Sequence, residues 1–178
     1  RAEKPSEIAA LIADVRQRAA KYGRDKIKFG LSIDTIARRS EQEALAEAQR
    51  YLDEAAEKQR LHASAAHAGL RSARVLSFEK EYADKDGSKN VNDFFIHPNV
   101  WSGFGYIGIP PGVALVGSYQ QIIERIKEYN SIGIDLFFLA GYPHLEEAYR
   151  LGEHVLPYFK TQRQALQRIP EESKYRIA

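Results

Sequence analysis

The sequence predicts an α/β fold, and within that class the C-terminal half of a (β/α)8 (TIM) barrel with a long insertion between its sixth and seventh strands. Helical and strand-like patterns alternate along the 178 residues, as they do where helices cover a parallel sheet. Three strands cannot close a barrel, and alone they would leave an apolar edge unpaired. Eight βα units need roughly 250 residues. We therefore expect a piece of a longer polypeptide, and an open doubly wound sheet is the structural alternative.

The composition suits one domain with a packed core, because 44% of the residues are hydrophobic and 11% are aromatic. The 26 basic and 24 acidic residues nearly balance, so no nucleic-acid partner is expected. The absence of cysteine excludes disulfides and thiolate metal sites. Neither a signal peptide nor an apolar stretch of membrane-spanning length is visible. We expect a cytoplasmic protein that binds no membrane and no metal ion.

The N-terminal part predicts one strand between two helices. Apolar residues at helical spacing indicate a helix over residues 5–22, and alternation of apolar and polar residues indicates a strand over 27–33. Ser40 and Glu43 form a capping-box pattern, which predicts a helix over residues 41–60.

A long segment with little periodicity follows, residues 61–112, rich in scattered charge and then in glycine and proline. Connections of this length are usually functional lids or mobile segments, with a passive solvated loop as the alternative. Trp101, the single tryptophan, is interpreted as a core anchor within it. We assign residues 1–170 to one domain that includes this insertion, and residues 171–178 to a polar tail.

Regular patterns return after the insertion. A continuous apolar run over 113–116 predicts a buried strand, and Ser118 with Gln121 forms a second capping-box pattern at the start of a helix. A second apolar run, residues 134–140, predicts another buried strand, and apolar residues at helical spacing over 145–159 predict the last helix.

The candidate functional residues are those expected at the C-terminal ends of the strands, where barrel enzymes place their active sites. His144 is a natural acid or base near neutral pH, and Tyr142 can donate a hydrogen bond to an anionic oxygen; structurally, they could merely cap and pack. Ser118 could bind a phosphate at its helix N-terminus or serve only as an N-cap. Asp34, near Ser32, could be a base, orient a ligand, or be a solvated turn residue.

Four stretches of the sequence are distinctive: KFGL at residues 28–31, PNVWSG at 98–103, ALVG at 114–117 and GYPHLEEAYR at 141–150. Together they resemble the C-terminal region of bacterial alkanesulfonate monooxygenases, a subfamily of the luciferase-like flavin-dependent monooxygenases. The resemblance covers roughly residues 5–160, and the GYPHLEEAYR run is its most specific part.

The resemblance implies a function. Reduced FMN, delivered by a separate NAD(P)H flavin reductase, would react with O2 to give a flavin (hydro)peroxide that oxygenates a small organic, organosulfur substrate. Tyr142 and His144 would lie in the flavin and substrate pocket, Ser118 would be a cofactor contact, and residues 61–112 would close as a lid. We also expect a homo-oligomer. The alternatives are a deazaflavin-dependent oxidoreductase of the same fold and a non-catalytic paralogue or subunit.

The chain departs from the sulfonate enzymes at three positions. They carry an arginine and a histidine on the sixth strand, where this chain has Ser32 and Asp34, and an arginine before the seventh strand, where we align Gly108. Arginine pairs bidentately with an anion such as a sulfonate, whereas a carboxylate repels a sulfonate. We therefore expect Asp34 and Ser32 to contact a different substrate, such as a sulfone, a thioether, a hydrocarbon or an amine.

Overall fold

The structure is a computed structural model that describes residues 4–61, 90–109 and 111–159. In chain order its elements are α1 (Pro5–Ala20), β1 (Gly30–Arg38), α2 (Glu41–Leu61), η1 (Val91–Phe94), β2 (Phe95–His97), β3 (Val100–Trp101), α4 (Gly103–Tyr106), β4 (Ala114–Ser118), α5 (Tyr119–Ser131), β5 (Leu136–Ala140), α6 (His144–His154) and η2 (Leu156–Tyr158).

The helices begin where the capping patterns predict. Pro5 occupies the first turn of α1, where a missing backbone N–H costs nothing. The hydroxyl of Ser40 accepts a hydrogen bond from the backbone N–H of Glu43 at 3.2 Å, at the start of α2. Ser118 and Gln121 cap α5 reciprocally, each side chain accepting from the backbone of the other. The capping box of Ser118 and Gln121 is confirmed, whereas at α2 only the Ser40 half is present, because the Glu43 carboxylate accepts from the backbone N–H of Arg39 at 3.2 Å instead of that of Ser40.

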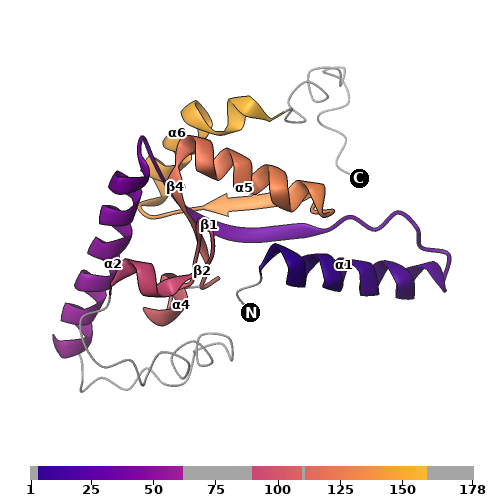
Figure 1. Cartoon of the computed structure of the whole chain (residues 1–178), viewed down its shortest axis with the longest axis horizontal. Helices are drawn as coiled ribbons and strands as arrows, with labels where there is room; N and C mark the ends of the chain where they lie inside the picture. The colour runs from indigo at the N-terminus through magenta and orange to yellow at the C-terminus, as the bar shows by residue number, and fades with distance from the viewer. Residues whose placement is uncertain (1–3, 62–89, 110, 160–178) are drawn as a thin grey trace, which may run out of the picture.

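The sheet has five strands in the order β2-β3-β4-β1-β5. The long strand β1 runs through the middle of the molecule (Figure 1) and is parallel to both of its neighbours, β4 and β5. The short strands β2 and β3 extend the sheet beyond β4 in antiparallel pairing. The predicted α/β class is confirmed, with a mixed rather than an all-parallel sheet.

The strand order differs from the expected half-barrel. Successive strands of a (β/α)8 barrel lie side by side, so the half-barrel requires the order β1-β4-β5. In the described residues β1 instead lies between β4 and β5, the order of the open doubly wound alternative. The nine-residue β1 is long enough for both pairings, because residues 30–34 pair with β5 and residues 34–38 pair with β4.

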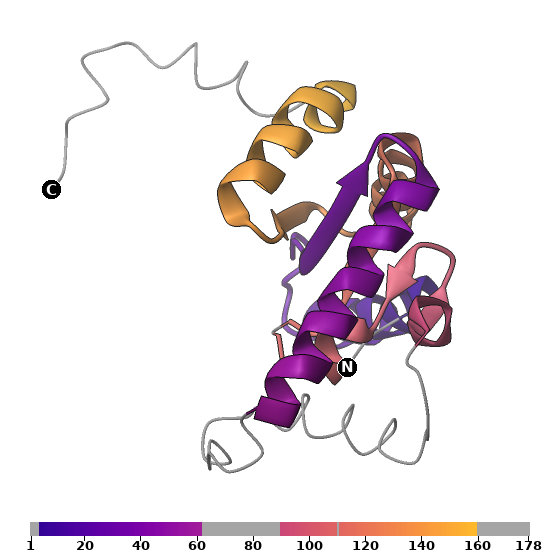
Figure 2. The same ribbon diagram turned by 90° about the vertical axis from the view of Figure 1, so that its left-hand side faces the viewer.

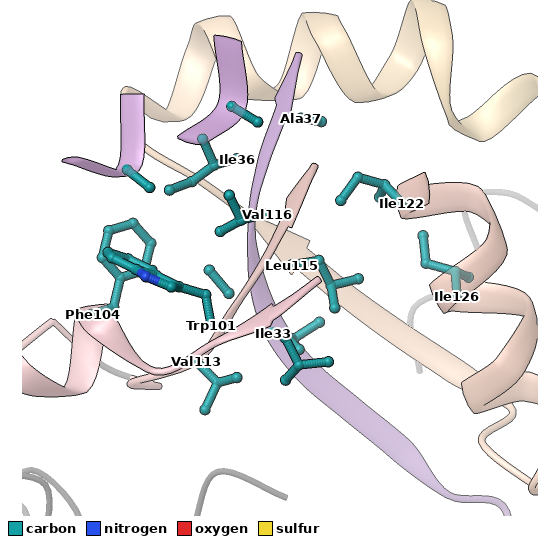
Figure 3. Packing of buried hydrophobic residues seen from close by; sticks show 14 of the residues in the cluster. Ile33, Ile36, Ala37, Trp101, Phe104, Val113, Leu115, Val116, Ile122 and Ile126 are labelled. Carbon is teal, nitrogen blue, oxygen red and sulfur yellow. The ribbon is translucent and has the colours of Figure 1, made fainter. Parts of the chain in front are cut away.

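The core lies on both faces of the sheet (Figure 3). Ile122 and Ile126 of α5 lie on the side to which Leu115 of β4 points, whereas Trp101 and Phe104 lie on the other side. Side chains alternate between faces along a strand, so Asp34 shares the face of Trp101, to which α2 also belongs through contact of its Tyr51 with Phe104.

The described part of the predicted insertion is regular and buried. Residues 91–106 form η1, β2, β3 and α4 rather than an irregular loop, so that expectation is corrected for these residues. Trp101 is fully buried and its indole N–H donates to the carbonyl of Val91 at 3.0 Å, which confirms it as a core anchor. Residues 62–89 of the predicted lid, and the predicted tail, 171–178, lie outside the described residues.

The predicted end of the first strand is wrong. A strand over 27–33 places Ser32 and Asp34 at its carboxyl end, but β1 continues to Arg38 and holds both residues in its interior. The polar pair Asp34-Thr35 resembles a strand end in sequence. In the fold, the Thr35 hydroxyl donates to the carbonyl of Ala140 on β5 at 2.9 Å, so its polar group is satisfied inside the sheet.

The last strand and helix complete the described structure. The predicted burial of the last strand is wrong, because β5 lies at the edge of the sheet and its Leu136 and Phe138 are 56% and 70% exposed. Among the described residues, the unpaired apolar edge that three strands predict is therefore present. α6 ends at His154, earlier than predicted, and Figure 2 shows it beside the tip of β1. Within the described residues, no helix is both long enough and apolar enough to cross a membrane.

Candidate active site

The candidate site lies where β5 ends against the middle of β1. Ala140, the last residue of β5, pairs with Asp34, whereas β1 runs four residues further, to Arg38. The chain therefore leaves the sheet beside Asp34, and Tyr142 and His144 follow within four residues. Three of the predicted site residues are thus brought together by strands that are more than 100 residues apart in sequence.

Gly141 allows the chain to turn closely against β1. A Cβ atom at this position would lie 2.7 Å from the carbonyl oxygen of Thr35 and 2.6 Å from Cγ of Glu147. Because the first of these atoms belongs to the backbone of the central strand, no larger residue fits without a shift of the sheet. The position of Tyr142 above β1 therefore depends on glycine at 141.

Among the described residues, two aromatic rings contact the ring of Tyr142, and two more pack against one of these. Its ring meets Phe104 edge-on at 5.7 Å and lies tilted against the imidazole of His144 at 4.6 Å. Phe104 in turn meets Trp101 at 5.4 Å and Tyr51 at 5.5 Å, both edge-on. The hydroxyl of Tyr51 donates to the backbone carbonyl of Tyr142. We call Trp101, Phe104, Tyr51 and Tyr142 the aromatic wall; such pairs are favourable beyond the area that they bury.

His144 has one ring nitrogen fixed and one free. Its Nδ1 lies 2.7 Å from the carbonyl oxygen of Gly141. A carbonyl can only accept a hydrogen bond, so Nδ1 carries the proton and Nε2 holds the lone pair of the neutral ring. Nε2 has no hydrogen-bond partner among the described residues, and the side chain is exposed. The ring therefore does not cap α6, since it binds a carbonyl rather than an N–H of the helix.

Asp34 is a buried carboxyl group rather than a solvated turn residue. It is 2% exposed, and its Oδ2 has no hydrogen-bond partner in the described part of the chain. Burial raises the pKa of the carboxyl from 3.8 to about 6, and the nearby charge of His144 lowers it again in part. Asp34 is thus ionised at neutral pH with an acceptor oxygen unused.

Tyr142 keeps its proton at neutral pH. Burial and, after it, the charge of Asp34 raise the pKa of the hydroxyl above its ordinary value of 10.0. Its half-buried hydroxyl can therefore donate a hydrogen bond to a ligand oxygen.

The two serines stand apart from this group. Ser32 is exposed and lies two residues before Asp34 on the same face of β1. Ser118 ends β4 opposite Arg38, and its hydroxyl accepts the backbone N–H of Gln121 at 3.3 Å. The N-cap alternative for Ser118 is therefore present in the structure, and its hydroxyl makes no contact with Tyr142 or His144 in the described residues.

An ion-pair network holds α6 against the end of β1, and the sequence reasoning missed it. Arg38 pairs with Glu147 of α6 and, at 3.0 Å, with Glu47 of α2, and Arg150 pairs with Glu147 at 2.7 Å. Glu147 is only 1% exposed. The available signal was an arginine directly after an apolar strand and an acidic residue on the inner face of an amphipathic helix.

Two other features lie outside the group. A shallow depression of about 410 Å³ is lined by residues 23–27, in the connection before β1. In the described residues, no group of three or more acidic, histidine or cysteine side chains is arranged to hold a metal ion.

Comparison with family models relates the chain to a known family. A model of the luciferase-like monooxygenase family matches residues 1–136 of the chain. The matched residues include Ser32, Asp34 and Ser118, and they end before Tyr142 and His144.

Proposed function

Since the chain belongs to the luciferase-like monooxygenase family, we propose that it carries out the flavin-dependent oxygenation of a small organic substrate at Asp34, Tyr142 and His144. The observation that carries this proposal is the meeting of the three side chains at the end of β5, with His144 Nε2 and Asp34 Oδ2 both unpaired in the described residues. Active sites commonly combine a group that can exchange protons, here His144, with a hydrogen-bond donor and an unpaired acceptor, here Tyr142 and Asp34.

The residues present fit the ring system of a reduced flavin. That ring is flat, and it carries N–H donors along one edge. The exposed face of the Tyr142 and His144 pair offers an aromatic surface against which such a ring can stack. The FMN phosphate is proposed at the N-terminus of α5, where it would compete with the Ser118 hydroxyl for the N–H of Gln121. Reduced FMN, when bound, supplies the electrons that activation of O2 requires.

The side chains then have distinct tasks. Nε2 of His144 accepts or returns a proton at the reacting centre. The Tyr142 hydroxyl donates to an oxygen that gains negative charge, the role of a preorganised donor. The buried rings of Phe104 and Trp101 keep water from the inner side of the site, and this strengthens both interactions.

The resemblance to the alkanesulfonate monooxygenases supports a proposal for the substrate and the partners. We propose a small organic molecule without a sulfonate group, namely a sulfone, a thioether, a hydrocarbon or an amine, because Ser32, Asp34 and Gly108 stand where the alkanesulfonate monooxygenases carry cationic side chains. A separate NAD(P)H flavin reductase in the cytoplasm would deliver the reduced FMN, and the working form would be a homo-oligomer.

Oxygen consumption tests the proposal. The 178-residue chain is mixed with FMN, NADH and a flavin reductase, and substrate-dependent O2 uptake and product formation are followed for a sulfone, a thioether, an alkane, an amine and an alkanesulfonate. His144→Ala should lower the rate of product formation by about a hundredfold, the scale of an acid–base group. His97→Ala is the matched control, because that histidine lies on β2, where its ring contacts Arg125 and Glu128 in the second half of α5.

Two results would contradict the proposal. One is O2 uptake equal to that of free reduced FMN with every substrate, which the non-catalytic alternative predicts. The other is an unchanged rate in His144→Ala. Turnover with a reduced deazaflavin in the absence of O2 would favour the alternative oxidoreductase.

A further inference from the structure

Asp34 is a charge that the fold leaves uncompensated. It lies in the interior of the central strand, it is 2% exposed, and its Oδ2 has no hydrogen-bond partner among the described residues. Removing a carboxylate from water without a partner is unfavourable, and structures normally compensate such a group with donors or a cation. A ligand that places a positive charge or an N–H donor near Asp34 can therefore form the hydrogen bond or ion pair that no described residue forms with Oδ2.

The neighbouring cation on the strand does not fill this role. Arg38 lies four residues further along β1, where it pairs with Glu47 at 3.0 Å and with Glu147. Two carboxylates therefore already take up its charge. The groups that interact electrostatically with Asp34 are instead His144 and Tyr142, the two side chains of the candidate site.

The surface above Asp34 suits a cation. The rings of Tyr142 and His144 lie 4.6 Å apart, half-buried and exposed respectively, and Phe104 closes the inner side. Aromatic faces attract ammonium groups, and a buried carboxylate beneath them adds to that attraction. A sulfonate at the same place would meet a like charge in a poorly solvated environment.

We propose that Asp34 determines the charge class of the substrate, so that the surface of Tyr142 and His144 binds an alkylammonium group in preference to an alkanesulfonate. Asp34 acts here through its charge, as a specificity-determining residue, and not as an acid or base. The inference rests on the proposed function only in placing the substrate at Tyr142 and His144. It narrows the substrate class from small organic molecules to those with a protonated nitrogen.

A binding experiment without flavin tests this inference. Hexylammonium and hexanesulfonate are titrated separately into the 178-residue chain at pH 8 and low ionic strength, where Asp34 is ionised and screening is weak. Trp101, the only tryptophan, reports binding through its fluorescence, because it touches Phe104, which touches Tyr142. Calorimetry gives the affinities independently.

The expected result is a preference for hexylammonium of tenfold or more, about 1.4 kcal/mol, in the unmodified chain. Asp34→Asn has the same shape without the charge and should reduce the preference to less than about threefold. Asp53→Asn removes an exposed carboxylate of α2 and should leave the preference intact. Far-UV circular dichroism establishes that both variants keep the fold.

Equal affinities, a preference for hexanesulfonate, no binding of either ligand at millimolar concentration, or an unchanged preference in Asp34→Asn would each overturn the inference. The outcome is separable from that of the proposed function, because no flavin or O2 takes part. A charge preference with no oxygenase activity would leave the inference standing and remove the proposed function. Oxygenase activity with no charge preference would do the reverse.

Discussion

Replacing Asp34 with asparagine should change the free energy of unfolding in a pH-dependent way. Relative to the unmodified chain, the variant should be more favoured at alkaline pH than at acidic pH. Burial raises the pKa of this carboxyl from 3.8 to about 6, with His144 opposing part of the rise. The folded state therefore holds the proton more tightly than the unfolded state. Folding stability from this group is highest below pH 3.8 and falls as the pH rises towards 6.

The magnitude follows from the pKa shift. About two pKa units at about 1.4 kcal/mol per unit amount to a loss on the order of 3 kcal/mol above pH 6, and about 2 kcal/mol of it falls between pH 4.5 and pH 8. Asparagine carries no charge at any pH, so Asp34→Asn lacks this loss. Comparing the two pH values cancels the constant effect of burying an amide in place of a carboxyl.

Urea unfolding at pH 4.5, 6 and 8 measures the effect. The stability difference between Asp34→Asn and the unmodified chain should shift by about 2 kcal/mol in favour of the variant from pH 4.5 to pH 8. Asp53→Asn, the exposed control, should show no comparable shift. If the two unfolding free energies of Asp34→Asn and the unmodified chain run parallel across the three pH values, Asp34 is not the buried ionisable group described above.

Further changes test the supports of the site, each by urea unfolding at pH 7. Arg38→Ala should destabilise the fold by about 3 kcal/mol, because the buried Glu147 then keeps only one partner; a loss below about 1 kcal/mol would count against this role. Tyr51→Phe should cost about 1 kcal/mol by removing its hydrogen bond to the backbone before α6, and an unchanged midpoint would contradict that bond. Gly141→Ala should destabilise by about 2 kcal/mol through its clash with the central strand. Gly152→Ala, inside α6 with no atom within 4 Å of the added Cβ, should instead stabilise by about 1 kcal/mol, and the same sign for both glycines would refute the clash.

Local features of the fold were predictable from the sequence. The capping residues Ser40 and Ser118 act within four residues of their partners, so their patterns carry the whole interaction. Trp101 was predictable as a core residue because it is a single large aromatic ring in a charged, glycine-rich segment, and tryptophan side chains are on average highly buried. The α/β class followed from the alternation of helical and strand periodicity, a local property as well.

The strand order was not predictable in the same way. Whether β1 lies beside β4 alone or between β4 and β5 depends on pairings such as Asp34 with Ala140, which join residues 106 positions apart. Periodicity reports that a strand is buried on both faces and says nothing about which strands flank it. The expectation of a half-barrel relied on the alternation of strands and helices, on the unpaired edge of three strands and on counting units, and the family resemblance agreed with it. None of these constrains the pairing of an individual strand.

The candidate site was predictable in part. Tyr142 and His144 were found because they directly follow the apolar run of residues 134–140, at a place where polar side chains are rarely accidental, although the strand itself is not buried as predicted. The burial of Asp34 was missed, because a carboxyl group inside a strand contradicts the ordinary rule that charged residues end strands. Tyr51 and Phe104 gave no functional signal, since aromatic residues at helical spacing are normally core residues.

The solution behaviour of the chain depends on the outer side of β5. Among the described residues that strand has no neighbour on one side, and it presents Leu136 and Phe138 to water with no charged residue between them. Uncharged rims of this kind favour edge-to-edge association between copies, and apolar association responds more to protein concentration than to salt. Dilution, rather than added salt, is therefore the means of keeping preparations of this chain monodisperse.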